Sequence, residues 1–426
     1  MSTTLENAQI ELSKQLGDFW NSTTTSSGST TTLIDTGLRA FNDGWIDSQS
    51  TQMWDRITSG TYDEEERRIT SLVNTTGTLN TLAHGGTIAS AVTYEVHRLF
   101  SASEKRRALI YASRNAYPFL NKLIDDETKV TGNWLINGSF EDYTSTVANN
   151  WTTDTLTAAK NTTKPLYKHG SASYKLSTAA GNIYQSSTET RDLVHLAGKN
   201  VTFTLQGWCD TASCLRLQIY DGTTTTSSSY HAGNSAWTKD NEPLKVQATI
   251  ADNPTEVTFR IVLADAGGTA YVDDARVISE TYTETYIGDL GLANNEPREV
   301  TVAYDYYFGK YRRLRGWRVD SDNFLVDIPC YSDQMLRITG IGYLDFLVSG
   351  AASELWTATI NIDKPQLDIL VAEAAKYLYG QKVMPNEESG ESDQYSRGYS
   401  FWDRELAKRK GMFGMKVPEA TTQWGN

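Results

Sequence analysis

Side chains that carry enzyme chemistry are few and scattered in this sequence of 426 residues. The five histidines stand at positions 84, 97, 169, 195 and 231, with no metal-ligand spacing among them. Nucleophilic catalysis needs a nucleophile, a base and a group that orients the base, but no Gly-x-Ser-x-Gly turn marks such a nucleophile. Carboxylates are numerous, yet no motif positions two of them as an acid–base pair, and no phosphate-binding glycine loop occurs. We therefore expect a protein that is not an enzyme.

The three cysteines give no sign of a metal site. Three cysteines cannot all pair within one chain, and Cys209 and Cys214 have no second Cys/His pair at ligand spacing. The sequence therefore predicts neither a zinc site nor a disulfide scaffold, and a reducing compartment fits best.

Positive charge gathers locally in a chain of net charge -13. The segment 310–318 brings basic residues together with aromatic ones; the basic residues are Lys310, Arg312, Arg313, Arg315 and Arg318. It could dock on an acidic neighbour or face DNA in a channel, or it could be the solvated face of a hairpin, and we favour an interface. The basic residues of helix 103–122 are Lys105, Arg106, Arg107 and Arg114, and for these we expect a solvated or intersubunit position.

The elements that would position these residues follow from hydrophobic periodicity. A short helix is expected over 5–19, followed by a Ser/Thr-rich tract that we expect to be flexible, so that residues 1–32 form a flexible arm. Short segments rich in Thr, Val and Ile between 33 and 100 predict a small β-barrel-like unit. Residues 103–122 then change to helical spacing, with Ser103 as a candidate N-cap.

A second all-β stretch and two helices complete the chain. Regularly spaced strands from about 132 to 278 predict an antiparallel sandwich, and further strands follow from 281. Asp363 is expected to cap a helix, and a second helix is expected over 393–410. This order predicts a host domain, formed by 33–131 and 281–410, into which the sandwich 132–280 is inserted. Residues 411–426 form a C-terminal arm that could dock on a partner or fold back on its own domain.

Two further expectations follow from composition. No apolar run reaches the ~20 residues of a membrane-spanning helix, so we expect no membrane. The N-terminus has no basic stretch followed by an apolar one, so we expect neither a secretory signal nor an organelle-targeting peptide.

Three motifs carry a resemblance over about 150 residues. They are Trp134-Leu-Ile-Asn-Gly-Ser-Phe-Glu, His169-Gly-Ser-Ala-Ser-Tyr-Lys-Leu and Ala270-Tyr-Val-Asp-Asp-Ala-Arg-Val. Together they resemble the jelly-roll carbohydrate-binding modules of the galactose-binding-like type. The resemblance implies that Glu141 and Asp273 are ligands of a structural Ca²⁺, a cation that prefers oxygen ligands. The alternative makes these two residues ordinary carboxylates in the turns of an edge strand.

Sugar binding would need exposed aromatic side chains that form a stacking platform. The candidates are Trp151, Trp208 and Trp237, and each of them could equally be a core residue; for each we favour the core. A shared fold does not bring the ligand with it.

The flanking sequence has a resemblance of its own. It is carried by Leu33-Ile-Asp-Thr-Gly-Leu, Asp43-Gly-Trp, the run from Ile57 to Ser71 and the run from Tyr94 to Leu109. These segments resemble head-to-tail adaptor proteins from the neck of tailed bacteriophages. The resemblance implies a multidomain α+β virion protein, in which a β unit and a helical bundle form the host domain and the jelly roll is inserted.

The same resemblance implies partners. They are other copies of the chain in a ring, twelve-fold by analogy with the family, together with the portal protein, downstream neck or tail proteins and, without sequence specificity, packaged DNA. Assembly would occur in the cytoplasm of the bacterial host. The alternative is a carbohydrate-binding receptor-recognition component of a tail or fibre, for which host glycans are the ligand. A module of a secreted polysaccharide enzyme is disfavoured because signal and catalytic motif are both missing.

Overall fold

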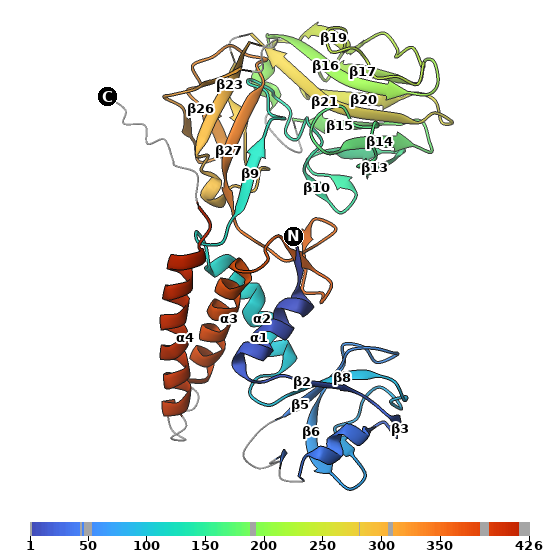
Figure 1. Ribbon diagram of the computed structural model, residues 1–426. Helices are drawn as coiled ribbons and strands as arrows, with labels where there is room; N and C mark the ends of the chain where they lie inside the picture. The colour runs from blue at the N-terminus through green and yellow to red at the C-terminus, as the bar shows by residue number, and fades with distance from the viewer. Residues whose placement is uncertain are drawn as a thin grey trace. The chain divides into compact units, whose positions relative to one another are not determined.

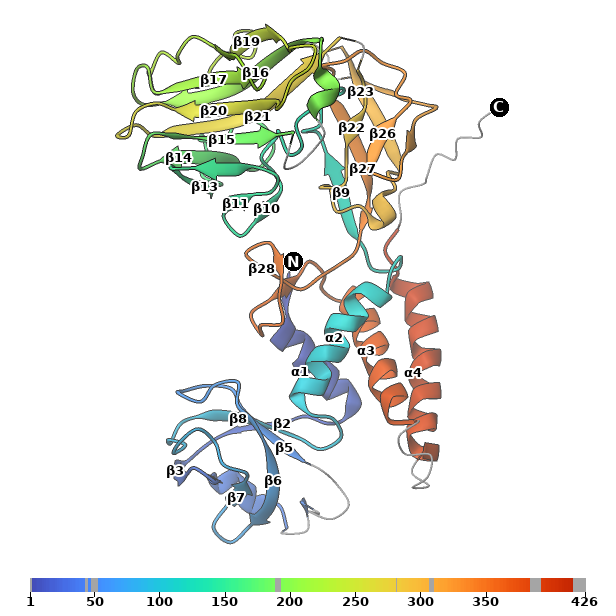
Figure 2. The same cartoon turned by 180° about the vertical axis from the view of Figure 1, so that it is seen from behind.

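The computed structural model describes residues 2–42, 45–46, 53–187, 193–280, 282–305, 310–383 and 392–416 (Figures 1 and 2). The chain forms two compact units. Among the described residues, the first combines the N-terminal part through Asn121 with Tyr343–Val348 and the chain from Ala352 to 416, and the second comprises Lys122–Gly342 with Ser349–Ala351. The first unit is therefore built from both ends of the chain, as predicted for a host domain.

A seven-stranded antiparallel sheet forms the β part of the first unit, in the order β2-β8-β5-β6-β7-β4-β3. The strands are β2 Trp20–Thr23, β3 Ser26–Ser29, β4 Thr32–Ile34, β5 Trp54–Ile57, β6 Glu66–Val73, β7 Thr78–Thr81 and β8 Thr93–His97, with a 3-10 turn over Thr36–Ala40. Its core gathers the apolar side chains of alternating strand positions, among them Leu33, Leu79 and Val96. A small all-β element stands where the sequence predicted one.

The structure differs from the sequence-based prediction of a flexible arm over residues 1–32. From residue 2 onward this segment forms β1 (Thr3–Thr4), α1 (Leu5–Leu16), β2, β3 and the start of β4. The tract has few apolar side chains, but sheet pairing satisfies its backbone: Thr25 N donates to Ile34 O and Gly28 N donates to Ile88 O, both at 2.9 Å. Since strand pairing depends on backbone hydrogen bonds as much as on apolar side chains, low hydrophobicity alone did not reveal these strands.

Four helices complete the first unit: α1 Leu5–Leu16, α2 Ala102–Asn115, α3 Gln366–Val383 and α4 Ser392–Phe413. Helix α1 ends at Gly17, whose φ of 69° is the left-handed C-cap conformation that favours glycine. The N-cap of α2 is Ser101, two residues before the predicted Ser103, because Ser101 and Glu104 form a capping box. Helix α3 packs against α1, α2 and α4.

A short sheet also joins the two ends of the chain within this unit. Strand β1 (Thr3–Thr4) pairs with β30 (Thr359–Ile360), which in turn pairs with β28 (Leu347–Val348) next to β29 (Ala351–Ala352). After α4, residues 414–416 turn back onto the unit: Met415 N donates to Phe119 O at 2.8 Å, and Phe413 and Met415 pack against the helical core. Of the two alternatives for the C-terminal arm, these residues take the fold-back; residues 417–426 lie outside the described part.

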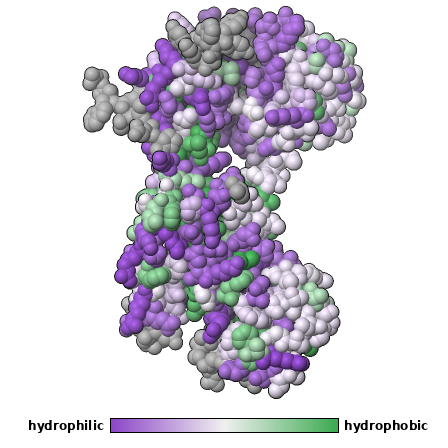
Figure 3. Space-filling model, in the orientation of Figure 1, coloured by the Kyte–Doolittle hydropathy of each residue, from purple (hydrophilic) through white to green (hydrophobic). Residues whose placement is uncertain are grey.

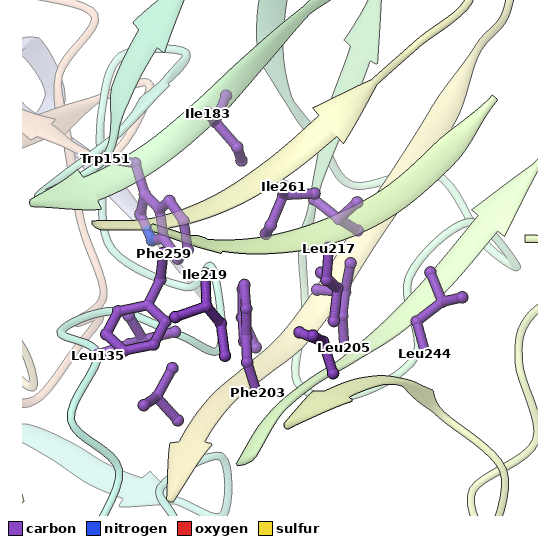
Figure 4. Close-up of a cluster of buried hydrophobic side chains, with 14 of the residues drawn as sticks. Leu135, Trp151, Ile183, Phe203, Leu205, Leu217, Ile219, Leu244, Phe259 and Ile261 are labelled. Atoms are coloured by element: carbon purple, nitrogen blue, oxygen red, sulfur yellow. The ribbon is translucent and has the colours of Figure 1, made fainter. Parts of the chain in front are cut away.

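The second unit contains a sandwich of two five-stranded antiparallel sheets, ordered β12-β15-β20-β17-β18 and β13-β14-β21-β16-β19. The bounds are β10 Tyr143–Thr144, β11 Val147–Ala148, β12 Thr152–Asp154, β13 Thr157–Asn161, β14 Ser173–Ser177, β15 Gly181–Ser186, β16 Asn200–Cys209, β17 Leu215–Tyr220, β18 Thr225–Ser227, β19 Leu244–Thr249, β20 Thr258–Leu263 and β21 Ala270–Ser279, with a 3-10 turn over Leu193–Leu196. Side chains from both sheets meet in one core (Figure 4). The predicted antiparallel β-sandwich is confirmed.

Two smaller sheets belong to the same unit, ordered β24-β23-β27-β9 and β22-β26-β25. Their strands are β9 Lys122–Asp126, β22 Thr285–Tyr286, β23 Glu299–Asp305, β24 Lys310–Arg313, β25 Arg318–Val319, β26 Phe324–Val326 and β27 Leu336–Gly342, with a 3-10 turn over Ala293–Asn295. Residues 282–342 therefore group with the sandwich, although the sequence placed them with the C-terminal helices. Strand β9 precedes the sandwich and pairs with β27 after it, and this pairing moves the boundaries from 132 and 280 to 122 and 342.

Cys209 and Cys214 are joined by a disulfide bond at the end of β16. The expectation that no disulfide is present was wrong for this pair, because a bridge over so short a separation needs no scaffold of several cysteines. Among the described residues, the helices include none long and apolar enough to span a bilayer.

Candidate functional sites

The basic segment 310–318 spreads over β24 and the turn to β25. Two of its guanidinium groups have partners within the unit: Arg313 Nε lies 3.1 Å from Glu299 Oε1, and Arg318 Nε lies 2.6 Å from Asp327 Oδ2. Arg312 and Arg315 are exposed and have no carboxylate partner in the described part of the chain. Lys310 begins β24, and its side chain lies outside the described part. The segment therefore offers two free guanidinium groups and not a continuous basic stripe.

Lys105 of α2 is completely buried, so the expected solvated or intersubunit position was wrong for this residue. Its Nζ lies 2.8 Å from Asp18 Oδ2 and donates to Ser13 Oγ at 2.9 Å. The reason is that the face of α2 with Lys105 packs against α1 and the sheet, where the ammonium group of the lysine neutralises the buried carboxylate of Asp18. Arg114 is also engaged, since its Nε lies 2.6 Å from Asp345 Oδ1.

The buried charges continue from Lys105 into the sheet. His97 Nδ1 lies 3.0 Å from Lys105 Nζ, and His97 Nε2 lies 3.2 Å from Glu95 Oε2. Burial lowers the pKa of His97, and the ammonium of Lys105 lowers it further, so the neutral imidazole is favoured. Burial also lowers the pKa of Lys105, against the opposing effect of Asp18. Ser13 and Lys105 resemble a nucleophile–base pair, but both are completely buried and no substrate reaches them.

A second histidine is held between carboxylates inside the same β unit. His84 Nε2 lies 3.0 Å from Asp55 Oδ2, and His84 Nδ1 lies 3.2 Å from Glu65 Oε2. The side chains of His84 and Asp55 are fully buried, and burial raises the pKa of Asp55. This arrangement joins β5 to the loop before β8, and Glu65, whose side chain is 25% exposed, is the one of the three that reaches the surface.

Glu141 and Asp273 both hold the loop of residues 168–172. Glu141 Oε1 accepts from Ser171 N at 2.8 Å and from Ala172 N at 3.0 Å. Asp273 Oδ2 accepts from Lys168 N at 2.8 Å and from His169 N at 2.9 Å. Gly170 between them has φ 64°, and a Cβ there would lie 2.2 Å from Glu141 Oε1.

The same two carboxylates were the calcium ligands implied by the resemblance. Burial raises the pKa of Asp273 to about 8 and also raises the pKa of Glu141. A cation would offset this cost, and the buried hydroxyl of Tyr143 has no hydrogen-bond partner near them. However, both oxygens of each carboxylate already accept hydrogen bonds, because Asp273 Oδ1 accepts from Asp274 N at 2.7 Å and Glu141 Oε2 accepts from Ser171 Oγ at 2.6 Å. Oxygen donors of the right type are thus present, and calcium stays a prediction.

The three candidate tryptophans divide into one core residue and two on the sheet surface. Trp151 is 5% exposed, donates from Nε1 to Asn137 O at 3.0 Å and lies in the sandwich core (Figure 4). Trp208 and Trp237 are half-buried and pair through their backbones. Trp208 also contacts Tyr271 edge to face, with ring centroids 5.2 Å apart. Trp151 is therefore a core residue, and Trp208 and Trp237 stay candidates for sugar stacking.

A cleft of about 540 Å³, which sequence patterns did not reveal, opens on the outer face of β16 and β21. At its centre, Arg276 donates from Nε and Nη2 to Asp274, at 2.7 and 2.6 Å, and from Nη1 to Asp333 at 2.8 Å. Although burial opposes it, the two carboxylates raise the pKa of Arg276, which keeps its charge. Thr204, Gln206 and His169 line the same cleft. The alternation of residues along β16 could have placed Thr204 and Gln206 on the outer face. No sequence pattern indicates the contact between Arg276 and Asp333.

No protein-family model matches this chain, and no curated protein matches it. Among solved structures, a xylan-binding family 22 module from Paenibacillus barcinonensis is 17% identical, with a TM-score of 0.26, over 35% of this chain and 96% of that one. The module TmCBM61, solved with β-1,4-galactotriose, is 15% identical, with a TM-score of 0.27, over 35% and 99%. The enzymatically active domain of tailspike protein 4 of bacteriophage CBA120 is 13% identical, with a TM-score of 0.27, over 34% of this chain but 21% of that one. At this identity the likeness concerns the fold alone.

Proposed function

We propose that this chain is a structural virion protein, a head-to-tail adaptor that forms a ring between the portal and downstream neck or tail proteins around the DNA channel. It acts by geometry and not as an enzyme. Assembly takes place in the cytoplasm of the bacterial host, and twelve copies close the ring.

The observation that carries this proposal is the construction of the first unit. Both chain ends fold together, through the pairing of β1 with β30 and the packing of α3 on α1 and α2, into a unit that does not include the sandwich. Its titratable clusters around Lys105 and His84 are buried and stabilise the unit from within. Exposed apolar side chains lie on its helices, notably Phe401 (51% exposed) and Met412 (63% exposed). A rigid unit with apolar side chains on its surface suits repeated contacts between copies.

Electron microscopy with mass determination tests the proposal, using the full chain alone and mixed with the portal of the same virus. Rings, or monomers that become ordered on the portal ring, are the expected result. A monomer that stays monomeric and ignores the portal would overturn it.

A second candidate, a carbohydrate-binding component of a tail or fibre, is favoured by the cleft on β16 and β21. Arg276 and Asp274 place fixed polar groups in its floor, and Trp208 lies on the same outer face of β16, two residues after Gln206. Fixed polar groups beside aromatic rings are the chemistry that recognises sugar hydroxyls and ring faces. Screening the full chain against immobilised glycans tests it: binding that Arg276→Met abolishes supports it, and no binding to any glycan rejects it.

A further inference from the structure

Helix α4 carries a stripe of basic and apolar residues on its exposed face. The stripe consists of Arg397, Phe401, Arg404, Lys408 and Met412. At about 100° per residue these five positions fall within an arc of about 80°, and at about 1.5 Å per residue they extend over about 22 Å. Trp402 and Leu406, which are buried, lie on the opposite side of the helix. The α4 stripe is therefore the face that α3 leaves uncovered, and Figure 3 shows apolar residues among hydrophilic ones on the helical surface.

Lys408 of the stripe lies 3.7 Å from Glu405 Oε1, but the two arginines of the stripe have no carboxylate partner among the described residues. Arg397 has no partner among the described residues, and Arg404 Nε donates only to the carbonyl of Ser400, at 3.2 Å. These two guanidinium groups flank Phe401, one turn before it and one turn after it. A half-exposed aromatic ring between two free cations is complementary to an apolar groove with an acidic rim.

A groove of that kind lies on α2 of the same unit. It has a volume of about 590 Å³, and its lining includes Ile110, Tyr111, Asn115, Phe346, Ser353 and Glu354. Tyr111 contacts Tyr377 with ring centroids 4.4 Å apart and the rings tilted by 30°, and it remains 46% exposed, so it forms an aromatic wall of the groove. Glu354 is exposed at the rim, and its carboxylate has no partner in the described part of the chain. The other acidic lining residue, Asp345, pairs with Arg114, which also lines the groove, so Glu354 is the carboxylate of this lining that remains available.

The stripe and the groove cannot meet within one copy. Helix α3 packs against both α2 and α4 and lies between them (Figures 1 and 2). The α4 stripe faces away from α3, and the groove opens on α2 and the 345–354 segment. A heterologous contact requires two complementary surfaces on different sides of one unit. Repetition of such a contact closes into a ring when the rotation between neighbouring copies divides a full turn.

We propose that Phe401 of one copy inserts into the α2 groove of the next copy, where Arg397 or Arg404 pairs with Glu354. This inference rests on the proposed ring-forming function and assigns its subunit interface. It commits the groove to a second copy of this chain and not to DNA or to another protein.

A mutation series on the full chain tests the assignment, with mass photometry and electron microscopy in the presence and absence of portal. Phe401→Ser should raise the concentration for half-assembly at least tenfold, as truncation of a central aromatic contact does. Tyr331→Ser, which removes an aromatic ring that is 82% exposed in the second unit, is the matched control and should assemble like the wild type. Equal thermal unfolding of the variants and the wild type excludes misfolding as the cause.

Exchanging the charges tests the proposed ion pair between Glu354 and Arg397 or Arg404. Glu354→Arg alone should weaken assembly, and so should Arg397→Glu or Arg404→Glu alone, whereas combining Glu354→Arg with one of the two arginine changes should restore it. Restoration by neither combination, or assembly of Phe401→Ser at wild-type concentration, overturns this interface. A wild-type chain that forms no ring with or without portal overturns the proposed function instead, so the two failures are distinguishable.

Discussion

Lys105 Nζ and Asp18 Oδ2 lie 2.8 Å apart, and neither side chain has any exposed surface. Asp18 in addition accepts from the backbone N–H groups of Leu99 and Phe100, at 3.1 and 3.2 Å, just before α2 begins. One carboxylate thus connects α1, the loop that follows the sheet and α2. A buried charge is strongly destabilising when its partner is absent. Each of the two residues is therefore tolerated in the interior only while the other is present.

Removal of one partner should therefore cost more than removal of both. Lys105→Met leaves a buried carboxylate and should lower the free energy of unfolding by about 3 to 5 kcal/mol. The double change Asp18→Asn with Lys105→Met should recover part of this loss. Urea unfolding followed by circular dichroism measures both, and a double variant less stable than the single one would contradict the pairing.

The neutral state of His97 predicts a pH dependence. Its pKa is lowered in the folded protein by burial and by Lys105, while Glu95 and Asp18 act in the opposite direction. The unfolded chain therefore binds more protons as the pH falls through the ordinary histidine value of about 6.5, and folding stability drops there. His97→Gln should flatten this part of the stability curve between pH 7 and pH 5. Equal slopes for the variant and the wild type would assign the pH dependence to other groups.

Asp273 predicts a dependence of opposite sign. Its pKa is raised to about 8 by burial, so the folded state binds more protons than the unfolded state between about pH 4 and pH 8, and stability falls as the pH rises through this range. Asp273→Asn should remove that fall.

If Glu141 and Asp273 bind calcium, millimolar Ca²⁺ should raise the melting temperature at pH 8 in the wild type and not in Glu141→Gln. An unchanged wild-type melting temperature would show that the two carboxylates only hold their loop.

The disulfide between Cys209 and Cys214 closes a loop with a sequence separation of 5. The chain-entropy relation gives about 2 kcal/mol for so short a loop, so Cys209→Ser should lower the stability by about that amount. Cys330→Ser, at the free half-buried cysteine, is the control. Denaturation with and without dithiothreitol measures the effect. The reductant should lower the stability of the wild type by the same amount and should leave the stability of the Cys209 variant unchanged.

The tryptophans of the sandwich should separate into two classes. Trp151 fills the core, so Trp151→Ala should cost about 3 to 5 kcal/mol of stability. Trp237 lies on the surface, where its Nε1 donates to Pro165 O at 3.0 Å, and Trp237→Ala should cost about 1 kcal/mol or less. Thermal unfolding compares the two, and equal losses would place both rings in the core.

The sequence predicted those features that depend on local periodicity. The four helices lie where apolar spacing of three and four residues placed them, and the sandwich strands follow strict alternation, as in Leu215, Leu217 and Ile219 of β17.

The features that escaped prediction depend on residues far apart in the chain. Lys105 reads as a surface residue because its neighbours Arg106 and Arg107 are charged too, and only the packing of α1 shows that it meets Asp18. The strands at 20–34 escaped because their pairing is carried by the backbone. The cleft around Arg276 escaped because Asp333 comes from beyond the sandwich.

The register of β9 against β27 brings the two ends of residues 122–342 together. Lys122 and Gly342, the first residue of β9 and the last of β27, are direct partners in the antiparallel ladder, so their Cα atoms lie roughly 4.5 to 5.5 Å apart. A bridge of about two or three residues could replace everything between them, and closing so short a loop costs little entropy. Residues 122–342 thus begin and end at directly paired positions of one antiparallel ladder, so their removal needs only a short connecting segment.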